Sequence, residues 1–192
     1  KCGSVGDSKP VVVLQVQNGT DEGSSKYTSC NNIKWISCRW ESSDYISCLL
    51  DNYTRQIYYL GSKWHGKLIL GPTGTSIVDF SQVNIKSHCS SISFTGCNMT
   101  NWSDTHIEAT GAHGITVTGS SISGAGVQNT STSRIKCGVL LTDCIGCSIT
   151  GNGFGIAGLD VDNRDGDVRV FGTNMTRNFV MNNGGSPNLD FR

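Results

Sequence analysis

The stretch 114–122 reads Gly-Ile-Thr-Val-Thr-Gly-Ser-Ser-Ile, and its pattern decides the fold. Two apolar residues alternate with threonines, a small residue follows, and a large apolar residue comes three positions later. The same pattern occurs six times, with copies beginning at Ile33, Ile57, Ile92, Ile115, Cys147 and Val168. A unit this short cannot bury its own apolar side, so the copies must stack and share one core.

Each copy predicts two or three short strands and almost no helix. The alternation marks one strand, the small residue marks a turn into a second, and a further short strand recurs upstream in 107–109, 139–141 and 159–161. Parallel strands need long connections, and a coil of about 20–35 residues per turn supplies them. The sequence therefore predicts an all-β protein, a right-handed parallel β-helix of about six or more coils with three short strands in each.

The stacking pattern covers most of the chain. We expect one β-helix domain over residues 1–182, clearest over 30–180, and an exit or linker segment over 183–192. The chain starts at Lys1 without an initiator methionine, so we expect it to be a fragment of a larger protein. Two long intervals, 65–83 and 123–136, predict loops that leave the coil, where recognition usually lies.

Composition excludes several classes of partner. The 15 lysines and arginines balance the 15 aspartates and glutamates, which argues against nucleic acid because that ligand selects a basic surface. No run of 18 apolar residues is present, so no membrane span is expected.

The nine cysteines first suggest a disulfide framework, but their positions follow the repeat. Cys30, Cys89 and Cys144 each lie three residues before the first position of alternate copies. Strands two copies apart are separated by about 9–10 Å, beyond the reach of a disulfide. Cysteine then acts as a small core residue, and we expect mostly free thiols and assembly in a reducing cytoplasm. A Cys144–Cys147 bridge is the alternative.

Three stretches, 92–100, 114–123 and 146–154, resemble the rungs of the pectin-lyase-like superfamily, and most of all the β-helix domains of bacteriophage tailspikes and polysaccharide depolymerases. The resemblance implies a bacterial surface polysaccharide as ligand, a homotrimer, and a location in the virion tail or outside the cell. The superfamily includes hydrolases, lyases, epimerases and stalks without enzymatic activity, so the resemblance does not specify a reaction.

Outward positions of the repeat form two columns. One places Thr95, Thr118 and Thr150 in line, as a hydroxyl ladder for sugar or, less expectedly, for ice. The bland alternative is that β-branched residues favour exposed strands. The same columns hold the apolar residues Ile36, Leu60 and Phe171 beside Tyr58, which predicts that a subunit, a loop or a sugar covers them.

Glu108 and Asp160 are the candidate catalytic residues. They occupy equivalent outward positions of the upstream strand, two copies and so about 9–10 Å apart, at the wide limit for an inverting glycosidase pair. The alternative is that aspartates near Asp160 stabilise turns. Their spacing matches no calcium loop, and no metal or cofactor is expected.

The stretches 111–115 and 133–136 resemble the Gly-His-Gly and Arg-Ile-Lys motifs of polygalacturonases. That family's Asn-Thr-Asp and paired-Asp motifs are absent, so its reaction is not implied. His113, Arg134 and Lys136 are instead candidates for binding an acidic sugar.

The leading hypothesis is a tailspike-like domain that binds, and in its enzymatic version cleaves, a bacterial surface polysaccharide. One alternative is a structural or adhesion stalk without enzymatic activity. The other is a small polysaccharide lyase or epimerase.

Overall fold

The computed structural model describes residues 2–3, 12–14, 31–42, 48–50, 54–66, 83–102, 105–125, 135–155, 166–173, 176–181, 183–184 and 189–191. Regular structure in these segments is entirely β, without a helix. The strands pair in parallel and form three sheets, named here A, B and C. The all-β prediction is confirmed.

The sheets contain six, seven and six strands. Sheet A consists of β1 (Cys2–Gly3), β4 (Arg39–Ser42), β7 (Lys63–Gly66), β10 (Asn98–Trp102), β13 (Ser121–Ala125) and β16 (Gly153–Gly155). Sheet B consists of β2 (Val12–Leu14), β5 (Cys48–Leu50), β8 (Val83–Ile85), β11 (Ile107–Thr110), β14 (Cys137–Thr142), β17 (Gly166–Phe171) and β19 (Leu189–Phe191). Sheet C consists of β3 (Asn31–Ile36), β6 (Arg55–Leu60), β9 (Ser90–Thr95), β12 (His113–Thr118), β15 (Ser148–Thr150) and β18 (Phe179–Met181).

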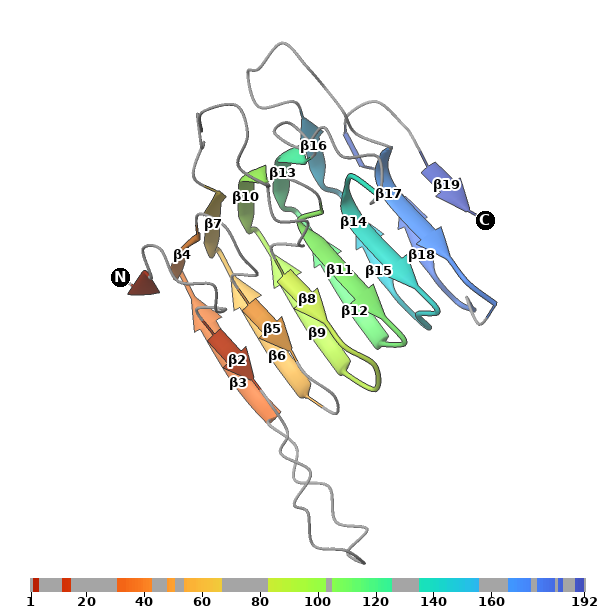
Figure 1. Cartoon of the computed structure of the whole chain (residues 1–192), viewed down its shortest axis with the longest axis horizontal. Coiled ribbons are helices and arrows are strands. Elements are labelled where there is room, and N and C mark those ends of the chain that lie inside the picture. Colours follow the sequence, from red (N-terminus) through yellow and green to blue (C-terminus); the bar gives the residue numbers. More distant parts are fainter. Residues whose placement is uncertain are drawn as a thin grey trace, which may run out of the picture.

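Up to β18, the chain visits sheets A, B and C in turn, so each coil adds one strand to each sheet. Figure 1 shows the coils stacked in sequence order from the end that carries β2 and β3 to the end that carries β17 and β18. This arrangement is a parallel β-helix, as the repeat predicts. The predicted exit segment 183–192 contains β19, whose residue Leu189 pairs with Val168 and extends sheet B.

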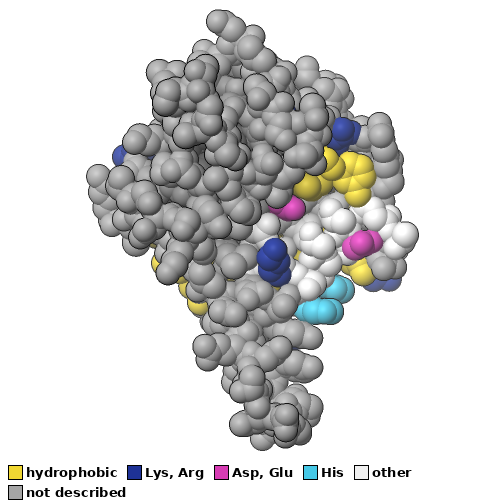
Figure 2. Space-filling view, viewed as in Figure 1, with side chains coloured by type: hydrophobic (Ala, Val, Ile, Leu, Met, Phe, Trp, Pro, Cys, Tyr) yellow, Lys and Arg dark blue, Asp and Glu magenta, His cyan; other side chains and the backbone are white. Residues whose placement is uncertain are grey.

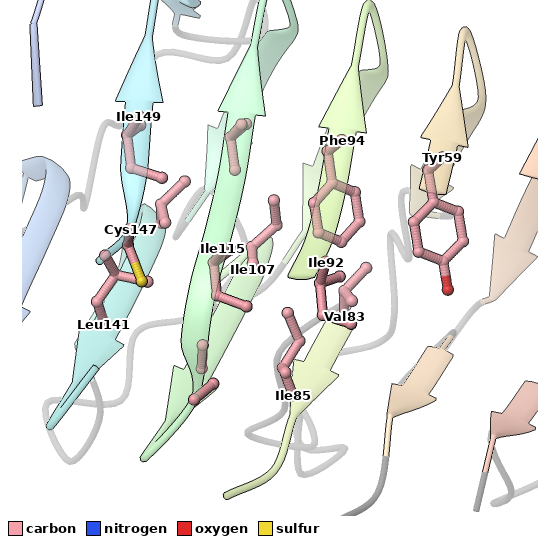
Figure 3. Close-up of a cluster of buried hydrophobic side chains, with 14 of the residues drawn as sticks. Tyr59, Val83, Ile85, Ile92, Phe94, Ile107, Ile115, Leu141, Cys147 and Ile149 are labelled. Carbon is pink, nitrogen blue, oxygen red and sulfur yellow. The ribbon is translucent and has the colours of Figure 1, made fainter. Parts of the chain in front are cut away.

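The core lies between the three sheets and is built by the inward residues of every strand. Figure 3 shows side chains from sheets B and C meeting there, and the labelled residues are 0–1% exposed. An aromatic cluster fills the coils of β6 to β9: the rings of Tyr59 and Phe94 stack with centroids 4.9 Å apart, and Trp64 meets both edge-on. The Tyr59 hydroxyl lies 2.9 Å from the Cys48 thiol.

Seven cysteines have side chains that the structure describes; all seven are free thiols, and six of them are buried. They contribute to the core as small residues, as the sequence predicts. Burial raises the pKa of the Cys48 thiol to about 12, so this group stays protonated at neutral pH. Cys144 and Cys147 lie within hydrogen-bonding distance of one another, and both remain thiols in this structure.

The small residue of the repeat makes the corner between sheets C and A. Gly119 has φ of 57° and Gly151 has φ of 63°, in the left-handed region where glycine avoids the penalty of a Cβ atom. The residue after the corner points inward, and polar residues there bond to neighbouring coils. Ser120 donates its N–H to Asn152 Oδ1 at 2.9 Å, and Asn152 donates its N–H to Asn183 Oδ1 at 3.0 Å.

The sixth copy of the repeat was predicted for the wrong sheet. Five copies lie in sheet C, but Val168 pairs with Val139 of β14, so the sixth copy is strand β17 of sheet B. The sheet C strand of that coil is β18, in which Val180 pairs with Ile149. The two sheets share one local pattern because strands of sheet B also end at left-handed corners, with φ of 61° at Gly111 and 116° at Gly172.

Candidate ligand-binding face

The outer side of sheet B carries a column of side chains in register, three of which are polar and one of which is leucine. Alternation along β8 buries Val83 and Ile85 and turns Asn84 outward. Strand pairing then places Glu108 beside Asn84, and Arg169 two strands further along. In sequence order the described outward residues are Asn84, Glu108, Leu140 and Arg169, which span about 14 Å at the usual interstrand spacing.

Glu108 is half-buried and is held by its neighbour in the column. Asn84 Nδ2 donates to Glu108 Oε2 at 3.5 Å, a long hydrogen bond that links β8 to β11. A carboxylate can accept about four hydrogen bonds, so one such group can serve protein neighbours and hydroxyl groups of a ligand at the same time.

Arg169 lies over an aromatic ring on the same strand. Its guanidinium carbon is 5.8 Å from the centre of the Phe171 ring, within the range of a cation–π interaction. Both side chains are half-buried outward residues of β17. The guanidinium is therefore restrained in orientation beside a partly exposed aromatic face.

Leu140 separates the two halves of the column. It points away from the core yet is only 7% exposed, so it separates Glu108 from Arg169 and offers a ligand little surface of its own. Two residues further along these strands is a second outward position. It is occupied by the exposed Thr110 on β11 and by the half-buried Thr142 on β14. Figure 2 shows uncharged side chains and backbone on the face in view, with acidic, basic and histidine side chains around them.

His113 lies at the corner between sheets B and C. Its backbone N–H donates to Cys89 O at 2.9 Å, and its side chain is exposed. The glycines that flank it in the polygalacturonase-like stretch serve the backbone, since Gly111 and Gly114 have φ of 61° and 63°. The histidine is therefore available at the edge of the face, and the glycines are explained by the corner.

The register position that the sequence predicts for Asp160 is held by another residue. Glu108 is in register with Leu140, and Leu140 is in register with Arg169, so Arg169 occupies the position expected for Asp160. Asp160 itself lies outside the described residues. The difference follows from the sixth copy: the sequence pattern assigns β17 to sheet C and segment 159–161 to sheet B, whereas β17 is the strand of sheet B next to β14.

Of the two basic residues predicted to bind an acidic sugar, Arg134 and Lys136, the structure describes one. Arg134 lies outside the described residues. Lys136 is only 6% exposed, which leaves little surface for a polymeric ligand. Nearby, His106 is fully buried with Nε2 3.0 Å from Ser123 O, and burial lowers its pKa to about 4.

The hydroxyl ladder lies on another face. Thr95, Thr118 and Thr150 are in register on the outer side of sheet C, and Tyr58 lies on β6 of the same sheet. Because sheets B and C are separate walls of the coil, one flat contact cannot cover both Glu108 and this ladder. The structure does not bring the predicted sugar-binding residues together at one site.

Sequence reasoning missed Asn84 and misplaced Arg169 and Phe171. Asn84 stands in a strand of three residues, too short to reveal alternation. Arg169 and Phe171 were recognised as outward residues but assigned to sheet C. A comparison of corner residues gives a weak signal, since Gly172 is followed by Thr173 where copies in sheet C have Cys, Ser or Asn.

Among the described segments, no group of three histidine, cysteine or acidic side chains is arranged to hold a metal ion. In the same part of the chain, no helix has the length and apolarity needed to cross a membrane.

No protein-family model and no curated protein matches the sequence. Among solved structures, the chain is similar to one named as a "putative glycosyl hydrolase" from Parabacteroides merdae. The TM-score is 0.51 at 11% identity, over 80% of this chain and 77% of the other. This likeness supports the fold.

Proposed function

We propose that this protein binds a polysaccharide along the outer face of sheet B. The observation that carries the proposal is the column itself: an amide, a carboxylate and an arginine beside an aromatic ring occupy outward positions of one parallel sheet. Sugars present paired hydroxyl groups and apolar ring faces, which planar polar side chains and aromatic rings recognise. The positions repeat from coil to coil, as a linear polymer requires.

The resemblance of the rungs to tailspikes extends this proposal. In that version the ligand is a bacterial surface polysaccharide, the protein belongs to a virion tail or acts outside the cell, and three copies assemble. The similar structure from Parabacteroides merdae is named as a "putative glycosyl hydrolase", a kind of enzyme that acts on carbohydrate. That name describes the other protein, and it supports a carbohydrate ligand for this one.

Binding without cleavage fits the described residues better than hydrolysis. Glycosidases need two carboxyl groups about 5–9.5 Å apart. Asp190 is in register with the column that contains Glu108 but lies three strands away, at about 14 Å. In the enzymatic version, Asp160 supplies the second carboxyl group. An adhesion stalk and a lyase or epimerase remain the alternative functions.

Binding is tested with a panel of bacterial capsules and lipopolysaccharides by calorimetry. Because hydrogen bonds to charged groups contribute about 1.5–3 kcal/mol, Glu108→Gln and Arg169→Met are each expected to weaken binding about 10–100-fold. Ser121→Ala, an exposed position of sheet A, serves as the control and should bind normally. Equal affinities of all four proteins for a bound glycan would refute this site.

Cleavage is tested separately by sizing the polymer after incubation. Shortening by the natural protein that disappears in Glu108→Ala and Asp160→Ala would support the enzymatic version. New ends that absorb in the ultraviolet would indicate a lyase instead. Binding without any shortening would leave the binding proposal and remove the enzymatic one.

A further inference from the structure

The outer face of sheet C reads almost the same in both directions along the coil axis. With β18 in its observed place, each strand presents two outward residues to this face. From β6 to β18 the pairs are Tyr58 and Leu60, Ser93 and Thr95, Thr116 and Thr118, Ser148 and Thr150, and Phe179 and Met181. An aromatic and an aliphatic residue stand at each end, hydroxyl pairs lie between them, and β12 is the centre.

The apolar ends of this face are exposed. Phe179 is 51% and Met181 is 45% exposed on β18, and at the opposite end of the sheet Ile36, on β3 beside β6, is 63% exposed. They are the large exposed hydrophobic residues found among the described segments. Tyr58 and Leu60 at the other end are half-buried. Exposed apolar residues gathered on one face usually mark an interaction surface.

We propose that sheet C binds a second copy of this chain, face to face, about a two-fold axis that lies between the two faces and runs parallel to β12. In this pair the coils run antiparallel, and each column faces its own counterpart. Tyr58 of one copy then meets Phe179 of the other, Leu60 meets Met181, and Thr95 meets Thr150. The hydroxyl pairs face each other and can exchange hydrogen bonds, since each hydroxyl both donates and accepts.

The order of residues is what selects a second copy. A two-fold interface must be self-complementary, because the same surface serves both partners. A two-fold rotation about an axis parallel to β12 exchanges the two apolar ends and maps the hydroxyl rows onto each other, so like meets like in the five rows from β6 to β18. The row of β3, with Lys34 and Ile36, lies beyond the paired rows. With the coils parallel instead, each Lys34 would lie near the Lys34 of the other copy, whereas antiparallel coils place the exposed Lys34 side chains at opposite ends.

The area suits a weak pair. Three strands of about 20 Å (β6, β9 and β12) and two of about 10 Å (β15 and β18), at about 4.8 Å spacing, give roughly 400 Å² on each copy. The total of roughly 800 Å² is below that of a stable interface and is typical of a weak, transient one. We therefore expect association that depends on concentration. The pair is an alternative to the trimer that the tailspike version of the function implies.

Sedimentation of the protein from low to near-millimolar concentration tests the inference. The mass is expected to rise from one chain of 20.5 kDa to two. Leu60→Lys alone and Met181→Glu alone should each keep the protein monomeric. The double variant Leu60→Lys/Met181→Glu should restore the pair, because in antiparallel coils the introduced lysine of one copy would face the introduced glutamate of the other.

Ser121→Lys, on the exposed start of β13, is the matched control and should pair normally. Circular dichroism and melting temperature verify that each variant is folded. A monomer at every concentration would overturn the inference, as would a mass of three chains. Failure of the double variant to restore pairing would also overturn it. So would a Met181→Glu variant that pairs normally but loses polysaccharide binding, since the face would then bind sugar.

Discussion

Asn152 accepts the backbone N–H of Ser120 on its side-chain oxygen at 2.9 Å, and thereby joins two successive coils at a buried corner. The same side chain donates from Nδ2 to Val117 O at 2.9 Å. Asn152 is 1% exposed, so these backbone groups are shielded from water. The corner is therefore a place where a side chain, and not a strand, completes the hydrogen bonding of the coil.

Asn152→Ala is expected to destabilise the protein by about 2–4 kcal/mol, because the variant leaves a buried donor and a buried acceptor unsatisfied. That loss corresponds to a melting temperature lower by roughly 4–16 °C. Asn152→Ser should lose less, since Ser120 at the equivalent corner accepts the Cys97 N–H at 3.1 Å. Ser121→Ala is the exposed control. Equal stability of the natural and alanine proteins would mean that water replaces the side chain.

Phe94→Ala is expected to cost about 3–5 kcal/mol, since it opens a cavity in a tightly packed core. Phe94 is fully buried, stacks on Tyr59 and meets Trp64 at 5.9 Å between centroids. Phe94→Leu keeps part of the volume and should cost less. Denaturant unfolding followed by tryptophan fluorescence gives both values. A cost below that of Phe94→Leu would contradict the packing argument.

The pH dependence of stability should reveal His106. Burial lowers its pKa from 6.5 in the unfolded chain to about 4 in the folded protein, so the folded state favours the neutral ring. The contribution of neutral His106 to the free energy of unfolding is fully present above pH 6.5. It is lost as the pH falls toward 4, because the unfolded state then binds the proton more readily than the folded state. The loss amounts to about 3 kcal/mol at most.

Urea unfolding at several pH values between about 7 and 4 checks this expectation. His106→Gln should remove most of the decline, whereas His113→Gln, at an exposed histidine, should keep it. If His106→Gln loses as much stability between about pH 7 and 4 as the natural protein, the loss arises from the carboxylates and not from His106.

Two glycine corners should respond differently to alanine. At Gly151 a Cβ would meet no atom within 4 Å, so Gly151→Ala should cost only the penalty of a left-handed φ, about 1–2 kcal/mol. At Gly172 a Cβ would lie 2.8 Å from the Asp143 backbone nitrogen and against its carboxylate. Asp143 Oδ1 also accepts the Thr173 N–H at 2.8 Å. Gly172→Ala should therefore lower the melting temperature more than Gly151→Ala, and the reverse order would contradict the close approach of Asp143 to this corner.

The first five copies of the repeat were assigned correctly from the sequence because their inward residues meet strand for strand in sheet C. Ile57, Ile92 and Ile115 pair in the expected order. The sixth copy was misplaced because alternation and a small corner residue are local requirements that sheets B and C share. Within the segment 166–173, only Thr173 after the corner glycine departs from the copies in sheet C.

That error carried into the candidate site. It assigned Arg169 and Phe171 to sheet C and gave Asp160 the position in sheet B, two strands from Glu108, that Arg169 occupies. Glu108 itself was identified correctly as an outward residue, since its alternation with Ile107 and Ala109 is visible locally. The hydroxyl ladder was also read correctly, but its separation from Glu108 depends on which wall of the coil each strand joins.

By itself, the sequence determined that this protein is a parallel β-helix with a cysteine-rich core, because alternation, corner residues and the need to stack are properties of each short segment. Only the tertiary structure decided which strand lies in which sheet. Connections of unequal length between the strands hide the register, and register is a relationship between coils. Both surfaces proposed here depend on it: Glu108 with Arg169 on sheet B, and Tyr58 with Phe179 at the two ends of sheet C.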